Sequence, residues 1–170
     1  MCGVLDDVLG PSPDVVFCGI NPGLMSAATG HHFARPGNRF WPALHLSGFT
    51  PRLLAPAEQH LLPEYGLGIT NLAPRASAKA SELTREELVE GGAALAAKVA
   101  GLAPKALAVL GVSAYRTAFL RPKARIGPQE ETVGGARVWV LPNPSGLNAH
   151  WTLAGIADEM RRLRSSLALP

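Results

Sequence analysis

Two asparagines follow apolar stretches of the sequence and stand next to prolines. Asn21 comes after the run 15–20 and precedes a Pro-Gly pair, and Asn143 lies between two prolines after the run 138–141. Proline restricts the residue before it, and glycine permits a sharp turn or the close approach of a ligand. Each carboxamide is therefore held in one direction and offers both donors and an acceptor. A polar binding site explains this pattern, and for Asn-Pro-Gly alone a plain strand-ending turn explains it equally well.

The elements that must position these asparagines alternate along the chain. Strands alternating with helices imply a parallel sheet covered on both faces, with the carboxyl ends of its strands at one ligand-binding edge. The two Asn-Pro turns should therefore lie together, and 24–39 should be a functional loop. Apolar runs predict strands at 15–20, 67–70, 106–111 and 138–141, and periodicity and caps predict helices at 40–46, 56–62, 84–102, after Ser113, and at 151–167.

Four short motifs together resemble the mismatch-specific uracil-DNA glycosylase and thymine-DNA glycosylase family. They are Gly-Ile-Asn-Pro-Gly at 19–23, Gly-His-His-Phe at 30–33, Pro-Gly-Asn-Arg-Phe-Trp at 36–41 and Asn-Pro-Ser-Gly-Leu at 143–147. The resemblance implies a three-layer α/β/α fold with a four-stranded parallel sheet in the order 2-1-3-4. It implies a monofunctional glycosylase that flips out and hydrolyses uracil in double-stranded DNA, chiefly at G·U pairs, to initiate base-excision repair. Thymine and other modified pyrimidines are further candidate substrates.

The resemblance also implies roles for residues around the first motif. Asn21 would be the catalytic residue, which positions a water below the sugar C1′, and Phe33 would stack on the base. An amide is no general base, so the glycosidic bond would break largely by departure of the base, and catalysis would be slow. Ile20, Ser26, His32 and Asn71 would complete the base pocket. Core packing for Phe33, a turn cap for Asn71 and solvent exposure for the paired histidines His31 and His32 are the structural alternatives.

The second motif would serve the opposite strand. Leu147 would be a wedge that fills the stack after the base leaves, unless it is a core leucine. Asn143, Ser145, Gly146 and Asn148 would shape this loop, contact phosphate and read the opposing base. The chain departs from the bacterial serine-arginine pattern after the leucine, which puts selectivity for an opposing guanine in doubt. Glu64 is a candidate base outside the motifs, and as a surface glutamate it would be inert.

Composition sets limits on cofactors and partners. At 170 residues the chain is expected to be one domain, 1–170, and a monomer. No stretch approaches the roughly 18 apolar residues of a membrane span, and no basic-then-apolar start predicts secretion, so a cytoplasmic protein without a membrane partner is expected. Cys2 and Cys18 form no ligand set with histidines, so neither a metal nor a cofactor is expected. The net charge of +3 permits DNA as the partner.

Two other classes of function compete with this interpretation. A catalytically weak relative that only binds lesions or mismatches in DNA would keep the same motifs, and abasic-site formation on a G·U duplex separates the two. A doubly wound nucleotide-binding enzyme would need a glycine-rich phosphate loop after a strand. No Gly-x-Gly-x-x-Gly or Walker-type sequence follows any predicted strand.

Overall fold

The centre of the molecule is a five-stranded sheet in the order β2-β1-β3-β5-β4. The computed structural model describes residues 5–169, so Cys2 lies outside the described residues. The strand order 2-1-3-4 that the resemblance implied is confirmed for the four strands predicted from apolar runs. These strands run parallel and are β1 (Val15–Gly19), β2 (Leu67–Asn71), β3 (Ala106–Leu110) and β5 (Arg137–Leu141).

The fifth strand, β4 (Gly127–Pro128), pairs antiparallel with β5 and was not predicted. A two-residue Gly-Pro strand carries no apolar alternation, so no sequence pattern could indicate it. At the opposite edge of the sheet, Val8 forms an antiparallel bridge with Ile69, with N–H···O distances of 2.9 and 2.8 Å. Val8 therefore pairs on the free side of β2, and β4 pairs on the free side of β5.

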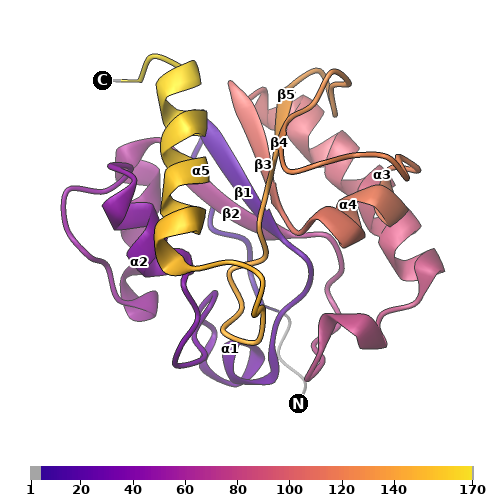
Figure 1. The fold of residues 1–170 in the computed structure, drawn as a ribbon, viewed down its shortest axis with the longest axis horizontal. Helices are drawn as coiled ribbons and strands as arrows, with labels where there is room; N and C mark the ends of the chain where they lie inside the picture. The colour runs from indigo at the N-terminus through magenta and orange to yellow at the C-terminus, as the bar shows by residue number, and fades with distance from the viewer. Residues whose placement is uncertain (1–4, 170) are drawn as a thin grey trace.

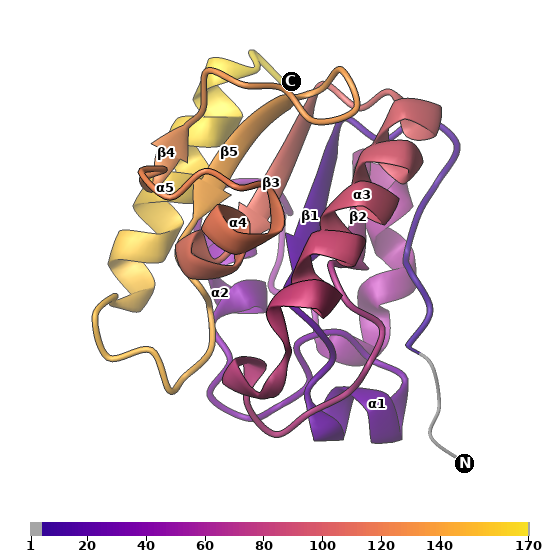
Figure 2. The same ribbon diagram turned by 90° about the vertical axis from the view of Figure 1, so that its right-hand side faces the viewer.

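Helices cover both faces of the sheet and complete the three predicted layers (Figures 1 and 2). Alternate side chains of β1 enter two separate cores: Phe17 packs with the helices on one side and the buried Cys18 with those on the other. Burial raises the pKa of the Cys18 thiol, so this cysteine is a packing residue. The first face carries α2 (Phe40–Leu46), η1 (Pro56–Tyr65) and α5 (Leu153–Ser166), and the second carries α3 (Arg85–Leu102) and α4 (Val112–Ala118).

The expectation that 24–39 is entirely loop is wrong. Its first part forms α1 (Leu24–Thr29), which ends at Gly30 with a φ of 76°. A helix of six residues is too short to show a helical period in the sequence, and Leu24 and Met25 are 58% and 44% exposed in the fold. A short turn of 3₁₀ helix, η2 (Ala80–Glu82), was not predicted either. Within 5–169 no helix is both long and apolar enough to cross a membrane.

Three strands end at the same edge of the sheet and bring three asparagines there. Asn71 is the last residue of β2, Asn21 lies two residues beyond β1, and Asn143 two residues beyond β5. Both views place α1 and the long loop between β5 and α5 at this lower end of the molecule (Figures 1 and 2). The prediction that the two Asn-Pro turns share one edge is confirmed.

Candidate active site

A cleft of about 570 Å³ opens at this edge of the sheet. Its walls come from the end of β1 with α1, from the segment 32–38, from the segment 71–81 after β2, and from the loop 143–148, which we call the wedge loop. No Asp or Glu belongs to its described lining. Every predicted site residue except Gly146 lines it: Ile20, Asn21, Ser26, His32, Phe33, Asn71, Asn143, Ser145, Leu147 and Asn148.

The carboxamide of Asn21 is fixed by the segment that follows β2. Its Nδ2 donates to the carbonyl oxygen of Arg75 and to Ser77 Oγ, both at 2.8 Å. Ser77 Oγ donates its own proton to the carbonyl oxygen of Lys79 at 2.7 Å, so toward Asn21 it can only accept. Two acceptors therefore face the nitrogen of Asn21, and this network decides which way the amide points. Asn21 Oδ1 accepts no hydrogen bond from residues 5–169 and is left for a ligand or a water.

An ion pair holds this segment in place. The Arg75 guanidinium donates to both carboxylate oxygens of Glu87, at 2.9 and 2.8 Å, and to the carbonyl oxygen of Glu82 at 2.9 Å. The hydrogen bond from Arg75, followed by one from the backbone of Thr84, lowers the pKa of Glu87 to about 2. Glu87 also completes the predicted capping box with Thr84 at the start of α3. Arg75 thus belongs to the scaffold of the Asn21 site.

An aromatic ring and a second carboxamide form the inner part of the cleft. The Phe33 ring stacks on Phe40 with centroids 4.3 Å apart, and its backbone has a φ of 53°, which is uncommon for a residue other than glycine. Asn71 lies beside Gly19 in the sheet register, and a Cβ at Gly19 would lie 2.5 Å from Asn71 Oδ1. The absence of a side chain at Gly19 therefore makes room for Asn71. The Asn71 carboxamide forms no hydrogen bond with the described chain, so it does not cap the turn before Pro74.

Ser26 and His32 are buried at the wall of the cleft. Ser26 Oγ accepts from the backbone N–H of Ala34 at 3.1 Å. His32 Nε2 lies 2.7 Å from the carbonyl oxygen of Asp6, which can only accept, so this nitrogen carries the proton. Burial lowers the pKa of His32, which keeps the imidazole neutral. The role of His32 in binding a base stays a prediction.

The wedge loop is shaped by its own polar side chains. Asn143 Oδ1 accepts from the N–H of Ser145 at 2.9 Å, Ser145 Oγ accepts from the N–H of Leu147 at 3.2 Å, and Asn148 Nδ2 donates to the carbonyl oxygen of Asn143 at 3.0 Å. Leu147 is 60% exposed, so it is not a core leucine. Gly146 lies outside the cleft, against Gly37. Asn143 and Ser145 thus form hydrogen bonds with the backbone of this loop, and their contacts with phosphate stay predictions.

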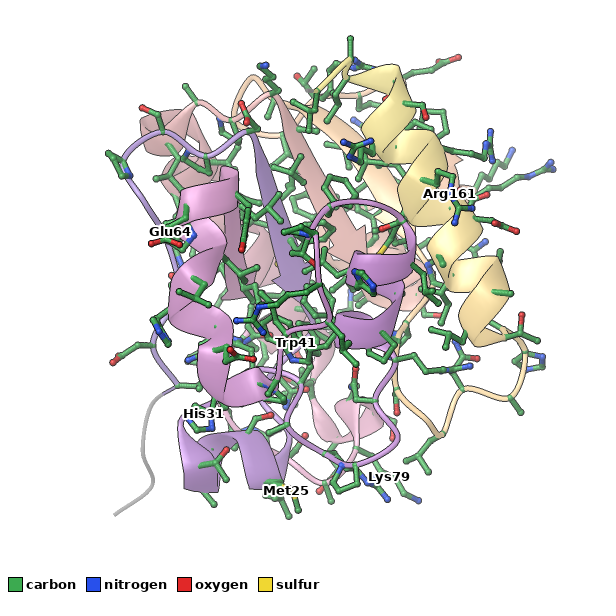
Figure 3. The ribbon with its side chains drawn as sticks, turned by 90° about the vertical axis from the view of Figure 1, so that its left-hand side faces the viewer. Met25, His31, Trp41, Glu64, Lys79 and Arg161 are labelled. Carbon is green, nitrogen blue, oxygen red and sulfur yellow. The ribbon has the colours of Figure 1, made fainter. Side chains whose placement is uncertain are left out.

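Two candidates from the sequence are not at the cleft. Glu64 is exposed on η1, and His31 lies beside α1, well apart from Lys79 (Figure 3). Neither residue lines the cleft. The structure therefore gives no support to Glu64 as a base that activates water at Asn21.

Cations at the mouth of the cleft differ in how they are used. Arg35 and Lys79 line the cleft, are exposed, and form no ion pair with the described chain. Lys79 points away from the body of the molecule (Figure 3). These two side chains are placed to meet a polyanion, whereas Arg75 is neutralised by Glu87. Within residues 5–169 no group of three or more His, Cys, Asp or Glu side chains could hold a metal ion.

Residues 7–165 match the family model of the uracil DNA glycosylase superfamily. The chain belongs to this superfamily. Its members are DNA glycosylases, hydrolases that act on DNA, and the match covers every described lining residue of the cleft except Leu5. The cleft of this superfamily member has the hydrogen-bonded carboxamide of Asn21 in its wall, and the exposed Leu147 lies on a hydrogen-bonded loop of the same cleft.

Three residues of the site were missed from the sequence. Ser77 lies 56 residues from Asn21, and no local pattern links the two. Gly19 acts through the absence of a side chain, which becomes visible only when β1 and β2 pair. Arg39 was noted only as a basic residue near the motifs, whereas its guanidinium hydrogen-bonds to the wedge loop. Long-range contacts of this kind need the folded chain.

Proposed function

We propose that this protein excises uracil from double-stranded DNA, chiefly from G·U pairs, as a monofunctional glycosylase of the mismatch-specific type. The observation that carries the proposal is the fixed carboxamide of Asn21 in a cleft that also holds Phe33 and Asn71. Its substrate would be a base taken out of the duplex, because a cleft at the end of a sheet cannot reach an atom inside a stacked helix.

The extruded base would be held by one ring and one amide. It would stack on the face of Phe33 that is turned away from Phe40, and such stacking contributes about 1–3 kcal/mol. Asn71 has both donors and an acceptor without a partner in the described chain, which suits the alternating donor and acceptor groups at the edge of uracil.

The chemical step would proceed without a general base. Asn21 Oδ1 would accept a hydrogen bond from a water below the sugar, and the carboxamide remains neutral. The C1′–N1 bond would therefore break first, with its electron pair leaving on uracil, and the oxocarbenium-like sugar would then be captured by the water. The water would release its proton to solvent. With no carboxylate among the described lining residues, we expect slow turnover.

Opening of the base pair would favour G·U. Leu147 is exposed on a loop held by hydrogen bonds, and its insertion would fill the vacated stack. A wobble pair needs less free energy to open than a Watson–Crick pair. An enzyme with a slow chemical step should therefore react fastest with the base that is easiest to extrude.

The test is abasic-site formation under single-turnover conditions. Duplexes with one G·U, A·U or G·T pair, and a single strand with one uracil, would be compared. We expect the G·U duplex to react fastest. Asn21→Ala should lose about a hundredfold or more in rate while its affinity for the duplex stays within a few-fold. Glu64→Gln is the matched control and should react like the wild type.

A different result would favour the other class of function. Tight, selective binding of G·U duplexes by the wild-type protein without abasic sites would identify a protein that senses mismatches. Wild-type turnover in Asn21→Ala would remove Asn21 from the mechanism.

A further inference from the structure

We propose that Arg39 is a positioning residue that sets the shape of the wedge loop and thereby presents Leu147 to the base stack. This inference deepens the proposed function and rests on it for its effect on catalysis. Its structural part, the control of the loop by Arg39, stands on contacts within the chain.

Arg39 binds the loop through a fan of hydrogen bonds to backbone carbonyls. Its NH2 group donates to the carbonyl oxygens of Ser145 at 2.6 Å and Asn148 at 2.9 Å. Its Nε donates to the carbonyl oxygen of Pro144 at 3.4 Å, and its NH1 group donates to that of Trp151. The backbone N–H of Arg39 also donates to the Pro144 carbonyl, at 2.9 Å. One side chain thus holds carbonyls on both sides of Leu147.

The wedge loop needs such a restraint because the leucine itself supplies none. With 60% of its surface exposed, Leu147 gains little from packing against the protein. The polar side chains of the loop bond within the loop and, from Asn148 Oδ1, to the N–H of the nearby His150, which fixes its local turns. Arg39 links these turns to the start of α2 through its side-chain hydrogen bonds. A loop that already has its inserting conformation before DNA binds loses less conformational entropy on binding.

A guanidinium is suited to this task for two reasons. It has five N–H donors in one plane, and four carbonyls from different residues take up donors on three of its nitrogen atoms. A lysine ammonium offers its donors from a single atom and cannot span the same set. Arg39 also forms no ion pair with a carboxylate in the described chain, so its positive charge remains behind a loop that would face phosphates.

The same link joins the loop to the wall that would hold the base. Arg39 immediately precedes Phe40, on which the Phe33 ring stacks. On the other side, a Cβ at Gly146 would lie 2.9 Å from the carbonyl oxygen of Gly37, so the wedge loop touches the segment before Arg39 directly. The position of Leu147 relative to Phe33 is therefore set through this short segment.

A double-mutant cycle with Arg39→Lys and Leu147→Ala tests the proposal. Lysine keeps the charge and avoids a cavity, which protects folding. We expect Arg39→Lys to slow excision from A·U and G·U duplexes by about tenfold and to affect single strands by less than about twofold. In the Leu147→Ala background, Arg39→Lys should add less than about twofold, because Arg39 acts through the leucine. Equal slowing in both backgrounds would overturn the proposal.

Hydrogen exchange gives a readout that does not depend on catalysis. The amides of Leu147 and Asn148 should exchange faster in Arg39→Lys, by about tenfold, while those of α3 stay unchanged. Gly146→Ala, which pushes the loop from Gly37 without touching Arg39, should give the same signature. Unchanged exchange in Arg39→Lys would refute the positioning role. Faster exchange together with a wild-type protein that forms no abasic sites would uphold the positioning role and reject the proposed function.

Discussion

A methyl group at Gly19 should close the base pocket with little strain in the backbone. Gly19 does not have a positive φ, so alanine is compatible with the strand conformation there. Its Cβ would, however, lie 2.5 Å from Asn71 Oδ1 and 3.3 Å from Phe33 Cζ. The Asn71 carboxamide must turn away, and the ring must shift.

The size of the effect follows from the contacts that are lost. Each hydrogen bond from Asn71 to the base edge contributes about 0.5–1.5 kcal/mol, and part of the stacking on Phe33 is lost as well. We expect Gly19→Ala to lose about 2 kcal/mol of transition-state stabilisation, which lowers kcat/KM for a G·U duplex about thirtyfold. The added methyl group should also cost about 1–3 kcal/mol of folding free energy, so activity must be measured well below Tm.

Gly68→Ala is the control for crowding alone. Its Cβ would lie 2.7 Å from Leu9 Cδ2, and Gly68 does not line the cleft. The Gly68→Ala variant should be less stable than the wild type but should keep its activity at low temperature. Combining Gly19→Ala with Asn71→Ala should be little worse than either change alone. Wild-type kcat/KM in Gly19→Ala, or an equal loss in Gly68→Ala, would refute the assignment of Asn71 to the base edge.

Three further predictions follow from other parts of the cleft. Leu147→Ala should lose about 2 kcal/mol of transition-state stabilisation in duplexes, which slows excision roughly thirtyfold. The loss should be greater on A·U than on G·U duplexes and small on single strands. Equal slowing on all substrates would mean that the leucine only supports the fold of its loop. Because burial lowers the pKa of His32 below its ordinary 6.5, the unfolded chain binds a proton more readily than the folded one, and stability falls as the pH drops below that value. Thermal melts from about pH 7.5 to about pH 5 should therefore fall less steeply for His32→Asn than for the wild type, and equal slopes would contradict this. Arg35→Ala and Lys79→Ala should each reduce the slope of log Kd against log salt by about 0.9. Arg121 does not line the cleft and forms an ion pair with Glu131, so Arg121→Ala should leave the slope unchanged. An unchanged slope in Arg35→Ala or Lys79→Ala would exclude a phosphate contact at that residue.

The layers of the fold could be predicted because each of the four parallel strands is a short apolar run. Phe17 and Cys18 face opposite cores, which is what a strand buried on both faces requires. The order of the strands came from the resemblance and not from the pattern, since apolar runs carry no information about which strand lies beside which. The helix α1 could not be predicted because six residues before a glycine are too few to show a helical period.

The site was predictable where the chain itself fixes a side chain, and less so where distant segments do. Asn21 and Asn143 stand beside prolines, so their importance could be inferred locally. Ser77 binds Asn21, 56 positions away, through its hydroxyl group, and Arg39 binds backbone carbonyls more than 100 positions away. Hydroxyl and carbonyl groups are common throughout any chain, so the sequence does not single these partners out. Their side chains are ordinary in type, and only the folded geometry distinguishes them from surface residues.

The pairing on the free sides of β2 and β5 affects the tendency of the protein to aggregate at high concentration. An unpaired strand exposes a row of N–H and C=O groups and invites another chain to pair with it, which is a common start of aggregation. Here Val8 occupies the free side of β2, and β4 shields β5 with a proline that has no N–H to offer. The free sides of β2 and β5 are thus not open to a strand of a neighbouring molecule at these residues. Removal of the segment around Val8 would uncover Ile69, and turbidity on concentration would be the first sign of self-association.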